Sequence, residues 1–171
     1  MASRKDCVAK GIKGCKFVVA ENLKADGAEP IYEISAFSEV SRHSPHIDRV
    51  ARETGVEARL IRAIMYMETT HGYYDAPLSL VGRNKSILPM NVNVEYWGNA
   101  FGDRKRLADP YANIKAGAEI LKAIIANLPP ESSVRQIATL YNNINAQVVT
   151  DYGARVEKIY ATQPWLRSTR K

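Results

Sequence analysis

The sequence predicts an all-α fold, because apolar residues recur at helical spacing in stretches that begin and end with helix-capping residues. Three helix starts can be identified: Ser44 before Pro45, Asp109 before Pro110, and Ser133 with Gln136 three residues later in a capping box. A further helix, over residues 60–72, carries a glutamate among its apolar residues. We expect this helix to organise the domain.

The first of these helices spans residues 44–55. Ile47, Val50 and Ala51 form its apolar stripe, and Gly55 is a typical helix stop. The glutamate helix begins almost immediately afterwards, so the two helices are expected to pack as neighbours.

Glu68 is the unusual residue of the second helix. Ile61, Ile64, Met65 and Glu68 are spaced i, i+3, i+4 and i+7, which places the carboxyl group on the apolar face. A carboxyl group against apolar walls has a raised pKa and can act as a general acid. The alternative is a glutamate at the core edge, paired with the nearby Arg59 or Arg62.

Residues 69–72 are expected to end the helix, because Thr69, Thr70, His71 and Gly72 lack the apolar pattern. Residues 73–101 show no periodicity, so we expect a long irregular loop after the glutamate helix. The loop is rich in aromatic residues, which suit stacking on sugar rings but are equally common in ordinary packing.

Two helical stretches follow. The first has an apolar stripe that ends before two prolines: Ile114, Gly117, Ala118, Leu121, Ile125 and Leu128. The second starts at the capping box and includes Tyr141. A last helix is expected to carry Tyr152, Val156 and Ile159.

Composition and charge narrow the class of protein. The chain has 171 residues, of which 46% are hydrophobic and 25% charged, as is ordinary for one globular domain. The net charge of +6 suggests an acidic partner, such as nucleic acid, an anionic membrane or the bacterial wall. No apolar run approaches the roughly 20 residues of a transmembrane helix. The basic start has no secretory h-region, so sequence alone predicts the cytoplasm.

Residues 1–43 are interpreted as a basic accessory arm rather than a second domain. Ile31, Ile34, Phe37 and Val40 are spaced for a short covering helix. Cys7 and Cys15 have no histidine nearby and no C-x-x-C spacing, which disfavours a zinc site. A local disulfide and two free thiols remain as alternatives.

Four short segments occur in an informative order and spacing. They are Met67-Glu68-Thr69; Leu88-Pro89-Met90-Asn91-Val92; Asp109-Pro110 with Asn113-Ile114, Gly117 and Leu121; and Leu140-Tyr141-Asn142-Asn143 with Tyr152 and Val156. These segments resemble four motifs of the lysozyme-like soluble lytic transglycosylases and goose-type lysozymes. In the same order, those motifs are the catalytic Glu-Ser step, the Gly-Leu-Met-Gln segment, the Asp-Pro helix, and the Ala-Tyr-Asn turn with its closing helix. The resemblance implies a lysozyme-like catalytic domain over residues 44–171.

The chain departs from the pattern of that family at several positions. Thr69 replaces serine but keeps the hydroxyl group, Asn91 replaces glutamine beside an unexpected Pro89, and Asn143 and Ile144 replace small residues and glycine.

The resemblance implies a peptidoglycan glycosidase that needs one obligatory carboxyl group and no metal or other cofactor. Glu68 would protonate the β-1,4 bond between N-acetylmuramic acid and N-acetylglucosamine. The resemblance further assigns substrate contacts to Thr69, Met90, Asn91, Tyr141 and Asn142, with Met90 and Asn91 as the floor and the Tyr141 hydroxyl fixing Glu68 or the acetamido group. Plain packing is the alternative for Met90 and Tyr141.

Hydrolysis and anhydro-forming transglycosylation stay open. Asp75 and Glu95 flank the expected cleft and could position a water, but neither matches the family's aspartate positions convincingly.

The divergence also resembles that of small antibacterial effectors delivered by type VI secretion. This resemblance implies delivery without a signal peptide into the periplasm of a target bacterium, and an acidic immunity protein that occludes the cleft. A catalytically inactive peptidoglycan-binding module is the main alternative. A nucleic-acid binder rests on charge alone, without a recognised motif, and is not expected.

Overall fold

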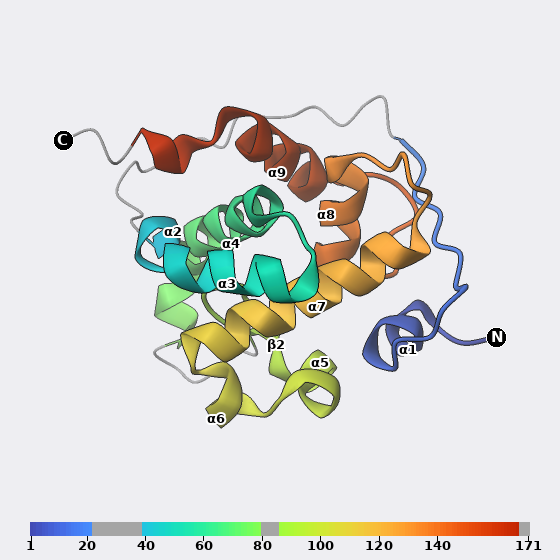
Figure 1. The fold of residues 1–171 in the computed structure, drawn as a ribbon, viewed down its shortest axis with the longest axis horizontal. Coiled ribbons are helices and arrows are strands. Elements are labelled where there is room, and N and C mark those ends of the chain that lie inside the picture. Colours follow the sequence, from blue (N-terminus) through green and yellow to red (C-terminus); the bar gives the residue numbers. More distant parts are fainter. Residues whose placement is uncertain (22–38, 80–85, 168–171) are drawn as a thin grey trace.

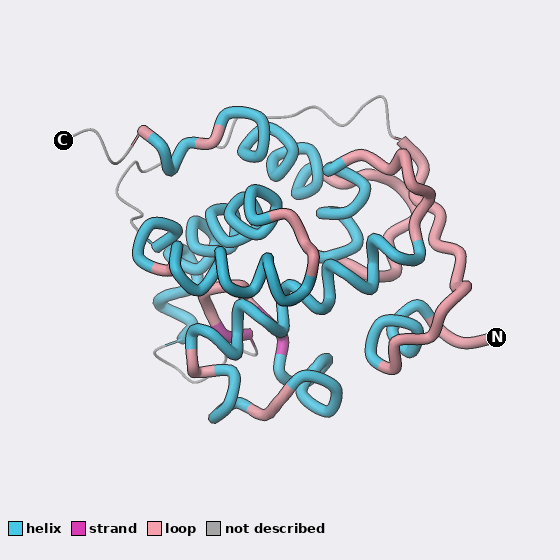
Figure 2. The backbone as a smooth tube through the Cα atoms, viewed as in Figure 1, coloured by secondary structure: helices cyan, strands magenta, loops and turns pink. Residues whose placement is uncertain are grey.

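The computed structural model describes residues 1–21, 39–79 and 86–167, with backbone only for 70–79 and 86. The described helices are α1 (Arg4–Ala9), α2 (Glu39–Arg42), α3 (Ser44–Thr54), α4 (Ala58–Ser79), α5 (Val94–Phe101), α6 (Arg104–Leu107), α7 (Pro110–Asn127), α8 (Val134–Asn142) and α9 (Asp151–Thr162), followed by a 3₁₀ turn, Pro164–Leu166. Two short antiparallel strands, β1 (Ser86–Ile87) and β2 (Val92–Asn93), form one hairpin. Helices dominate the chain, which confirms the all-α class (Figures 1 and 2).

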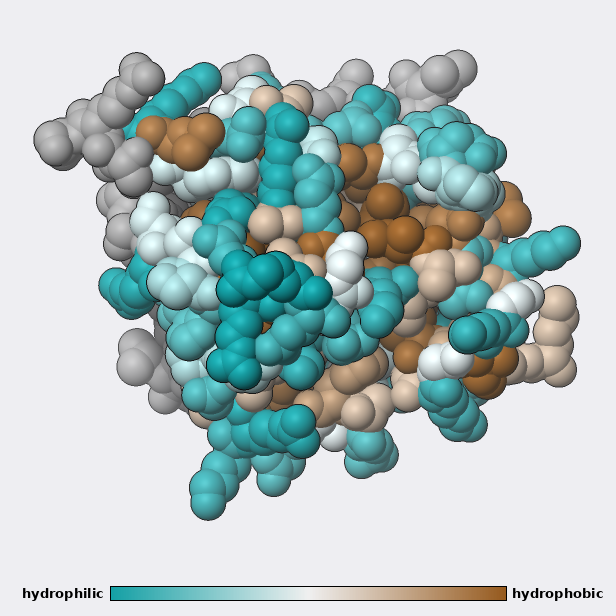
Figure 3. Space-filling model, viewed as in Figure 1, coloured by the Kyte–Doolittle hydropathy of each residue, from teal (hydrophilic) through white to brown (hydrophobic). Residues whose placement is uncertain are grey.

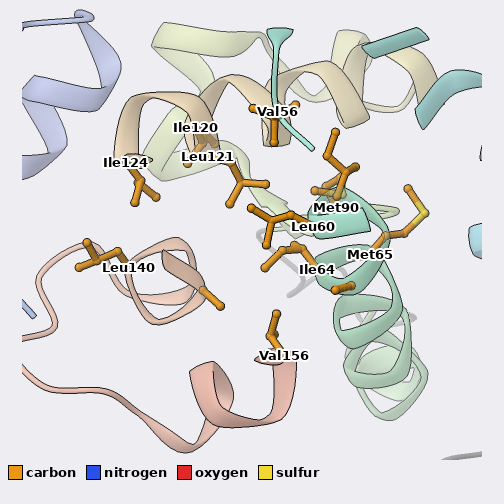
Figure 4. Packing of buried hydrophobic residues seen from close by; sticks show 14 of the residues in the cluster. Val56, Leu60, Ile64, Met65, Met90, Ile120, Leu121, Ile124, Leu140 and Val156 are labelled. Atoms are coloured by element: carbon orange, nitrogen blue, oxygen red, sulfur yellow. The ribbon is translucent and has the colours of Figure 1, made fainter. Parts of the chain in front are cut away.

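Helices α4 and α7 form the centre of the molecule. Helix α3 packs against both, and α8 and α9 pack against each other and complete the core. Figure 4 shows Leu60 and Ile64 of α4 facing Leu121 of α7, with Val156 approaching from α9. Truncating one buried Leu or Ile to Ala typically costs about 2–5 kcal/mol, so this cluster holds α4 firmly in place.

Local capping signals determine where the helices begin. The side chain of Asp109 accepts a hydrogen bond from the Ala112 amide at 2.8 Å, with Pro110 in the first turn. The capping box of Ser133 and Gln136 is formed as predicted. Gly55 ends α3 in the left-handed conformation, at φ 77°.

Two details of these helices differ from the prediction. Ser44 is the first helical residue of α3, and His43 occupies the cap position. Ile125, expected in the buried stripe of α7, is 39% exposed, because it points away from the centre of that stripe.

The expected end of the glutamate helix at residues 69–72 is wrong, since α4 continues to Ser79. The Thr69 hydroxyl donates to the Met65 carbonyl one turn earlier, so this residue is accommodated inside the helix instead of ending it. The prediction of a long irregular loop over residues 73–101 is also wrong. The end of α4, the β1–β2 hairpin and α5 occupy its described residues.

The N-terminal segment packs onto the helical core. Helix α1 contacts α7 and α5, and a disulfide joins Cys7 to Cys15. Phe17 and Val19 are buried in the same hydrophobic cluster as the central helices. Of the short helix expected over residues 31–40, Val40 lies buried in α2, and the other apolar positions lie outside the described residues.

Hydrophilic side chains cover most of the face shown in Figure 3, and hydrophobic ones gather over α7 and α8. A pocket between α7, α8 and the start of α4 has Val56, Leu60, Ile125 and Ile137 among its lining residues. None of the helices in the described parts of the chain combines the length and apolar character needed to cross a membrane.

Candidate active site

Glu68 lies in the interior of α4, with only 4% of its surface exposed. Its neighbours Ile64 and Met65 are fully buried, as the helical spacing predicts. The two arginines considered as its partners are engaged elsewhere. Arg59 donates to the Tyr160 carbonyl at 2.7 Å, and Arg62 binds Asp48 at 2.6 Å. An ion pair with Arg59 or Arg62 therefore does not account for the buried position of Glu68.

Both carboxylate oxygens of Glu68 accept hydrogen bonds from neutral side chains. The Tyr152 hydroxyl donates to Oε1 at 2.5 Å, and the Asn91 amide donates to Oε2 at 2.7 Å. These donors come from α9 and from the turn between β1 and β2. Hydrogen bonds of this kind orient a carboxyl group and offset part of the cost of burying it.

Asn91 reaches Glu68 because its backbone is left-handed, with φ 55°. Asparagine tolerates this conformation better than most residues, so its presence in this tight turn is physically reasonable. The preceding Met90 is fully buried. It packs onto Gly117 of α7, where a Cβ atom would lie 2.9 Å from the Met90 Cβ.

Asn113 anchors the same turn from α7 and is itself fully buried. Its Oδ1 accepts from the Met90 amide at 2.9 Å. Its Nδ2 donates to the carbonyls of Ile87 and Leu107 at 2.9 and 3.0 Å. One side chain therefore connects the hairpin, α6 and α7, and through Met90 it fixes the position of Asn91.

Tyr152 is placed by the close packing of α9 on α8. The next residue, Gly153, lies so near the Arg135 backbone that a side chain there would collide with it. Burial and the nearby Glu68 carboxylate raise the pKa of the Tyr152 phenol well above its usual value. The phenol therefore keeps its proton and acts as a donor.

The Tyr141 hydroxyl donates to the Met90 carbonyl at 2.8 Å, and Tyr152 makes the contact with Glu68 that was one of the two alternatives expected of Tyr141. Burial, with a smaller contribution from the Glu68 charge, also raises the pKa of Tyr141 well above the usual range. Tyr141 therefore supports the turn that carries Asn91.

A cavity of about 280 Å³ opens beside Glu68. This volume is close to the lower end of small-molecule sites, about 300 Å³. Aromatic and amide side chains dominate its described lining, which consists of Glu68, Asn91, Val92, Asn93, Tyr96, Trp97, Ile120, Tyr141, Asn142, Asn143, Ile144 and Asn145. Among these residues Glu68 is the one carboxylic acid.

The structure brings Glu68, Asn91, Tyr141 and Asn142, four of the residues that the resemblance assigned to the site, together on this cavity. Thr69 and Met90 are placed differently. The Thr69 hydroxyl bonds within α4, and the Met90 side chain is buried in the core, so neither side chain is part of the described lining.

Of the two acids considered for a hydrolytic water, Glu95 is exposed in the first turn of α5 and outside the described lining. The side chain of Asp75 lies outside the described residues.

Sequence reasoning missed several residues that shape this site. Tyr152 was assigned to a helical stripe and to the closing helix of the family resemblance, but no role at the site was predicted for it. Asn93, Asn143 and Asn145 carry no periodic signal, because Asn93 ends a strand, Asn143 caps α8 and Asn145 lies in the loop after α8. Tyr96 and Trp97 were noted only as members of an aromatic-rich stretch.

Comparisons of the chain with protein-family models, with curated proteins and with solved structures give no match. Within the described residues, no group of three or more His, Cys, Asp or Glu side chains is arranged to hold a metal ion. The chemistry of the site is therefore inferred from its own residues.

Proposed function

We propose that the chain is a peptidoglycan glycosidase that cleaves the β-1,4 bond between N-acetylmuramic acid and N-acetylglucosamine, with Glu68 as the catalytic acid. The observation that carries the proposal is a buried carboxyl group, Glu68, the one acid in the described lining of a cavity rich in amides and aromatic rings. This combination favours a neutral, hydroxyl-rich substrate over a charged one.

The lining suits the two faces of a pyranose. Amide side chains both donate and accept hydrogen bonds, which matches hydroxyl and acetamido groups. The partly exposed Tyr96 offers an aromatic ring at the cavity, and Trp97 packs edge-on against it at 4.7 Å between centroids. An aromatic surface of this kind can stack on the apolar C–H face of a sugar.

The first chemical step needs one proton donor. Glu68 in its protonated form transfers a proton to the glycosidic oxygen, while the bond between that oxygen and the anomeric carbon breaks. The acetamido oxygen of the substrate attacks the anomeric carbon and takes over its positive charge, in the substrate-assisted variant of glycoside cleavage. No second protein carboxylate is required.

The second step returns the proton to Glu68. Its carboxylate removes a proton from a water or from the 6-hydroxyl group of the same sugar, and that oxygen attacks the anomeric carbon as the acetamido oxygen leaves. Water yields a reducing end, and the 6-hydroxyl yields a 1,6-anhydro sugar. Tyr152 and Asn91 hold the two oxygens of Glu68 in both steps.

The decisive experiment compares Glu68→Gln with the wild type on purified peptidoglycan. Glutamine keeps the size and polarity of the protonated acid but has no proton to transfer. We expect muropeptide release to fall by about 10²–10⁴-fold, the usual contribution of a general acid, with little change in melting temperature. Mass spectrometry of the released fragments separates hydrolysis from anhydro formation.

Glu131→Gln is the matched control, because Glu131 is exposed in the loop between α7 and α8. A Glu68→Gln protein that melts normally and cleaves at the wild-type rate would contradict the proposal. A wild-type protein that sediments with peptidoglycan but releases no fragments would be an inactive binding module. Periplasmic delivery and an acidic inhibitor stay predictions of the effector resemblance.

A further inference from the structure

The N-terminal segment lies behind one wall of the cavity. That wall is the loop of residues 143–149 between α8 and α9, and three of its residues, Asn143, Ile144 and Asn145, face the cavity. Figure 1 shows α1 at the edge of the molecule, beside α7 and α5. The contacts that hold this loop therefore influence the shape of the cavity.

Arg4 of α1 binds the loop directly. Its Nη1 donates to the carbonyls of Ile144 and Ala146 at 3.2 and 2.7 Å, and its Nη2 donates to the Val18 carbonyl at 2.8 Å. The guanidinium also lies over the Phe17 ring, 5.5 Å from its centroid. Hydrogen bonds from a charged donor are stronger than neutral ones, so this one side chain holds two carbonyl groups of the wall.

Two further contacts tie the same segment to the cavity. The Lys5 ammonium lies 4.2 Å from the centroid of the Tyr96 ring, which lines the site. The backbone of Ala20 accepts from the Val149 amide at 3.0 Å and donates to the Gln147 carbonyl at 2.9 Å. The wall is thus held by Arg4 of α1 and by the backbone of Ala20.

The disulfide keeps α1 in place. This helix has six residues, far fewer than the roughly 12–15 that an isolated helix needs even for marginal stability in water. Its buried side chains are Cys7 and Val8, and Cys7 is bonded to Cys15 across a turn containing Gly11 and Gly14. Without the bond, Val8 is the one buried side chain of α1 left to anchor the helix, beside the contacts of Arg4 and Lys5.

We propose that Arg4 is a positioning residue for the substrate site and that the Cys7–Cys15 disulfide holds it there, so that the 143–149 wall is fully formed only in the oxidised protein. A dithiol reductant would supply two electrons and two protons, leave both cysteines as thiols and become a disulfide itself. The choice of a sugar as ligand rests on the proposed function, whereas the coupling between α1 and the wall does not.

Arg4 is expected to act on binding more than on chemistry. The wall contacts bound sugar, while Glu68 is held separately by Tyr152 and Asn91. Loosening of the wall should therefore raise KM and leave kcat nearly unchanged. This pattern is expected when an interaction that binds the substrate and the transition state equally well is lost.

The experiment uses full-length Arg4→Ala and Arg4→Lys, with Arg59→Ala as the matched control. Arg59 also donates to two carbonyls, those of Tyr160 and Ala161, and lies 4.2 Å over the Tyr160 ring, but it is outside the cavity lining. The ligand is a trimer of N-acetylglucosamine, with binding followed by tryptophan fluorescence, in which Trp97 lies at the cavity and Trp165 lies outside its described lining.

We expect Arg4→Ala to weaken trimer binding and raise KM by about tenfold, the effect of losing roughly 1.4 kcal/mol. Arg4→Lys should recover part of this loss, and Arg59→Ala should lower the melting temperature without changing affinity. Equal effects of Arg4→Ala and Arg59→Ala on KM, or no effect of Arg4→Ala, would overturn the positioning role.

Hydrogen exchange separates this inference from the proposed function. Amides of residues 143–149 should exchange faster in Arg4→Ala, in Cys7→Ala/Cys15→Ala and in the reduced wild type, while those of α9 stay protected. Unchanged exchange in the wall would overturn the coupling, even for a protein that cleaves peptidoglycan. A wild type that neither binds the trimer nor cleaves peptidoglycan would overturn the proposed function, and the exchange result would still decide the coupling.

Discussion

At the scale of single residues, two neutral donors from the described part of the chain, Asn91 and Tyr152, hold the acid of the site. Asn91 comes from a strained turn and Tyr152 from a helix packed closely on its neighbour. Since the pKa of the Tyr152 phenol is raised by burial first and by Glu68 second, its proton is retained at neutral and moderately alkaline pH. The donor is therefore present throughout the working range of an acid-base glutamate.

Tyr152→Phe tests this arrangement, because it removes the hydroxyl group and leaves the ring packing intact. A hydrogen bond to a charged group contributes about 1.5–3 kcal/mol, so kcat should fall by about 10- to 100-fold. Tyr141→Phe is the matched variant, since its hydroxyl binds the Met90 carbonyl. It should lower stability by about 1 kcal/mol and affect kcat less. Steady-state rates and thermal melts on the same preparations would check both, and a larger loss of kcat in Tyr141→Phe would reverse the two roles.

At the scale of elements, helices α3 and α7 are joined by a small polar cluster. Glu53 of α3 accepts from the Tyr111 hydroxyl at 2.5 Å and from Arg49 at 2.8 Å, and it pairs with Lys115 at 3.1 Å. Tyr111 and Lys115 belong to α7, so this one carboxylate connects the two helices. The hydrogen bond from Tyr111, followed by those from Arg49 and Lys115, lowers the pKa of Glu53 from 4.5 to about 2.

This lowered pKa predicts the pH dependence of the α3–α7 contact. A carboxylate with a folded pKa below its unfolded value stabilises the fold above the unfolded value and loses that contribution on protonation. The wild type should therefore melt above Glu53→Gln at pH 6. The difference should shrink as the pH falls from about 4.5 through about 2. Glu131→Gln, with the same change of charge on an exposed loop, should show no such convergence, and a constant gap between wild type and Glu53→Gln would contradict the assignment.

At the scale of the whole molecule, the N-terminal segment is joined to the helical core by a covalent bond and by buried side chains. Cys7, Phe17 and Val19 lie in the same cluster as the residues of α4 and α7. The disulfide spans a sequence separation of 8. A short closed loop restricts the unfolded chain less than a long one does, so its stabilising effect falls in the lower part of the usual range.

Reduction should therefore lower the free energy of unfolding by about 2–3 kcal/mol. Urea denaturation with and without reductant would measure this loss, with Cys7→Ala/Cys15→Ala as the variant that reductant does not affect. A similar midpoint for the oxidised and reduced wild type would mean that α1 contributes little to global stability.

Much of the fold could be predicted because its signals are local. Helix starts at Asp109 and Ser133 depend on a side chain and an amide within one turn, so the sequence carries them without reference to the rest of the chain. The burial of Glu68 was also predictable, since residues at i, i+3, i+4 and i+7 share one helix face in any surroundings.

The remainder was decided by the tertiary structure, because it depends on contacts between residues distant in sequence. Tyr152 and Glu68 are 84 positions apart, and periodicity cannot distinguish which of two tyrosines reaches a given acid. The continuation of α4 beyond Gly72 also follows no local rule. Sequence alone determined that an acid would lie on an apolar helix face. Tertiary packing determined which donors hold it and which asparagines surround it, since only packing brings separate elements to one cavity.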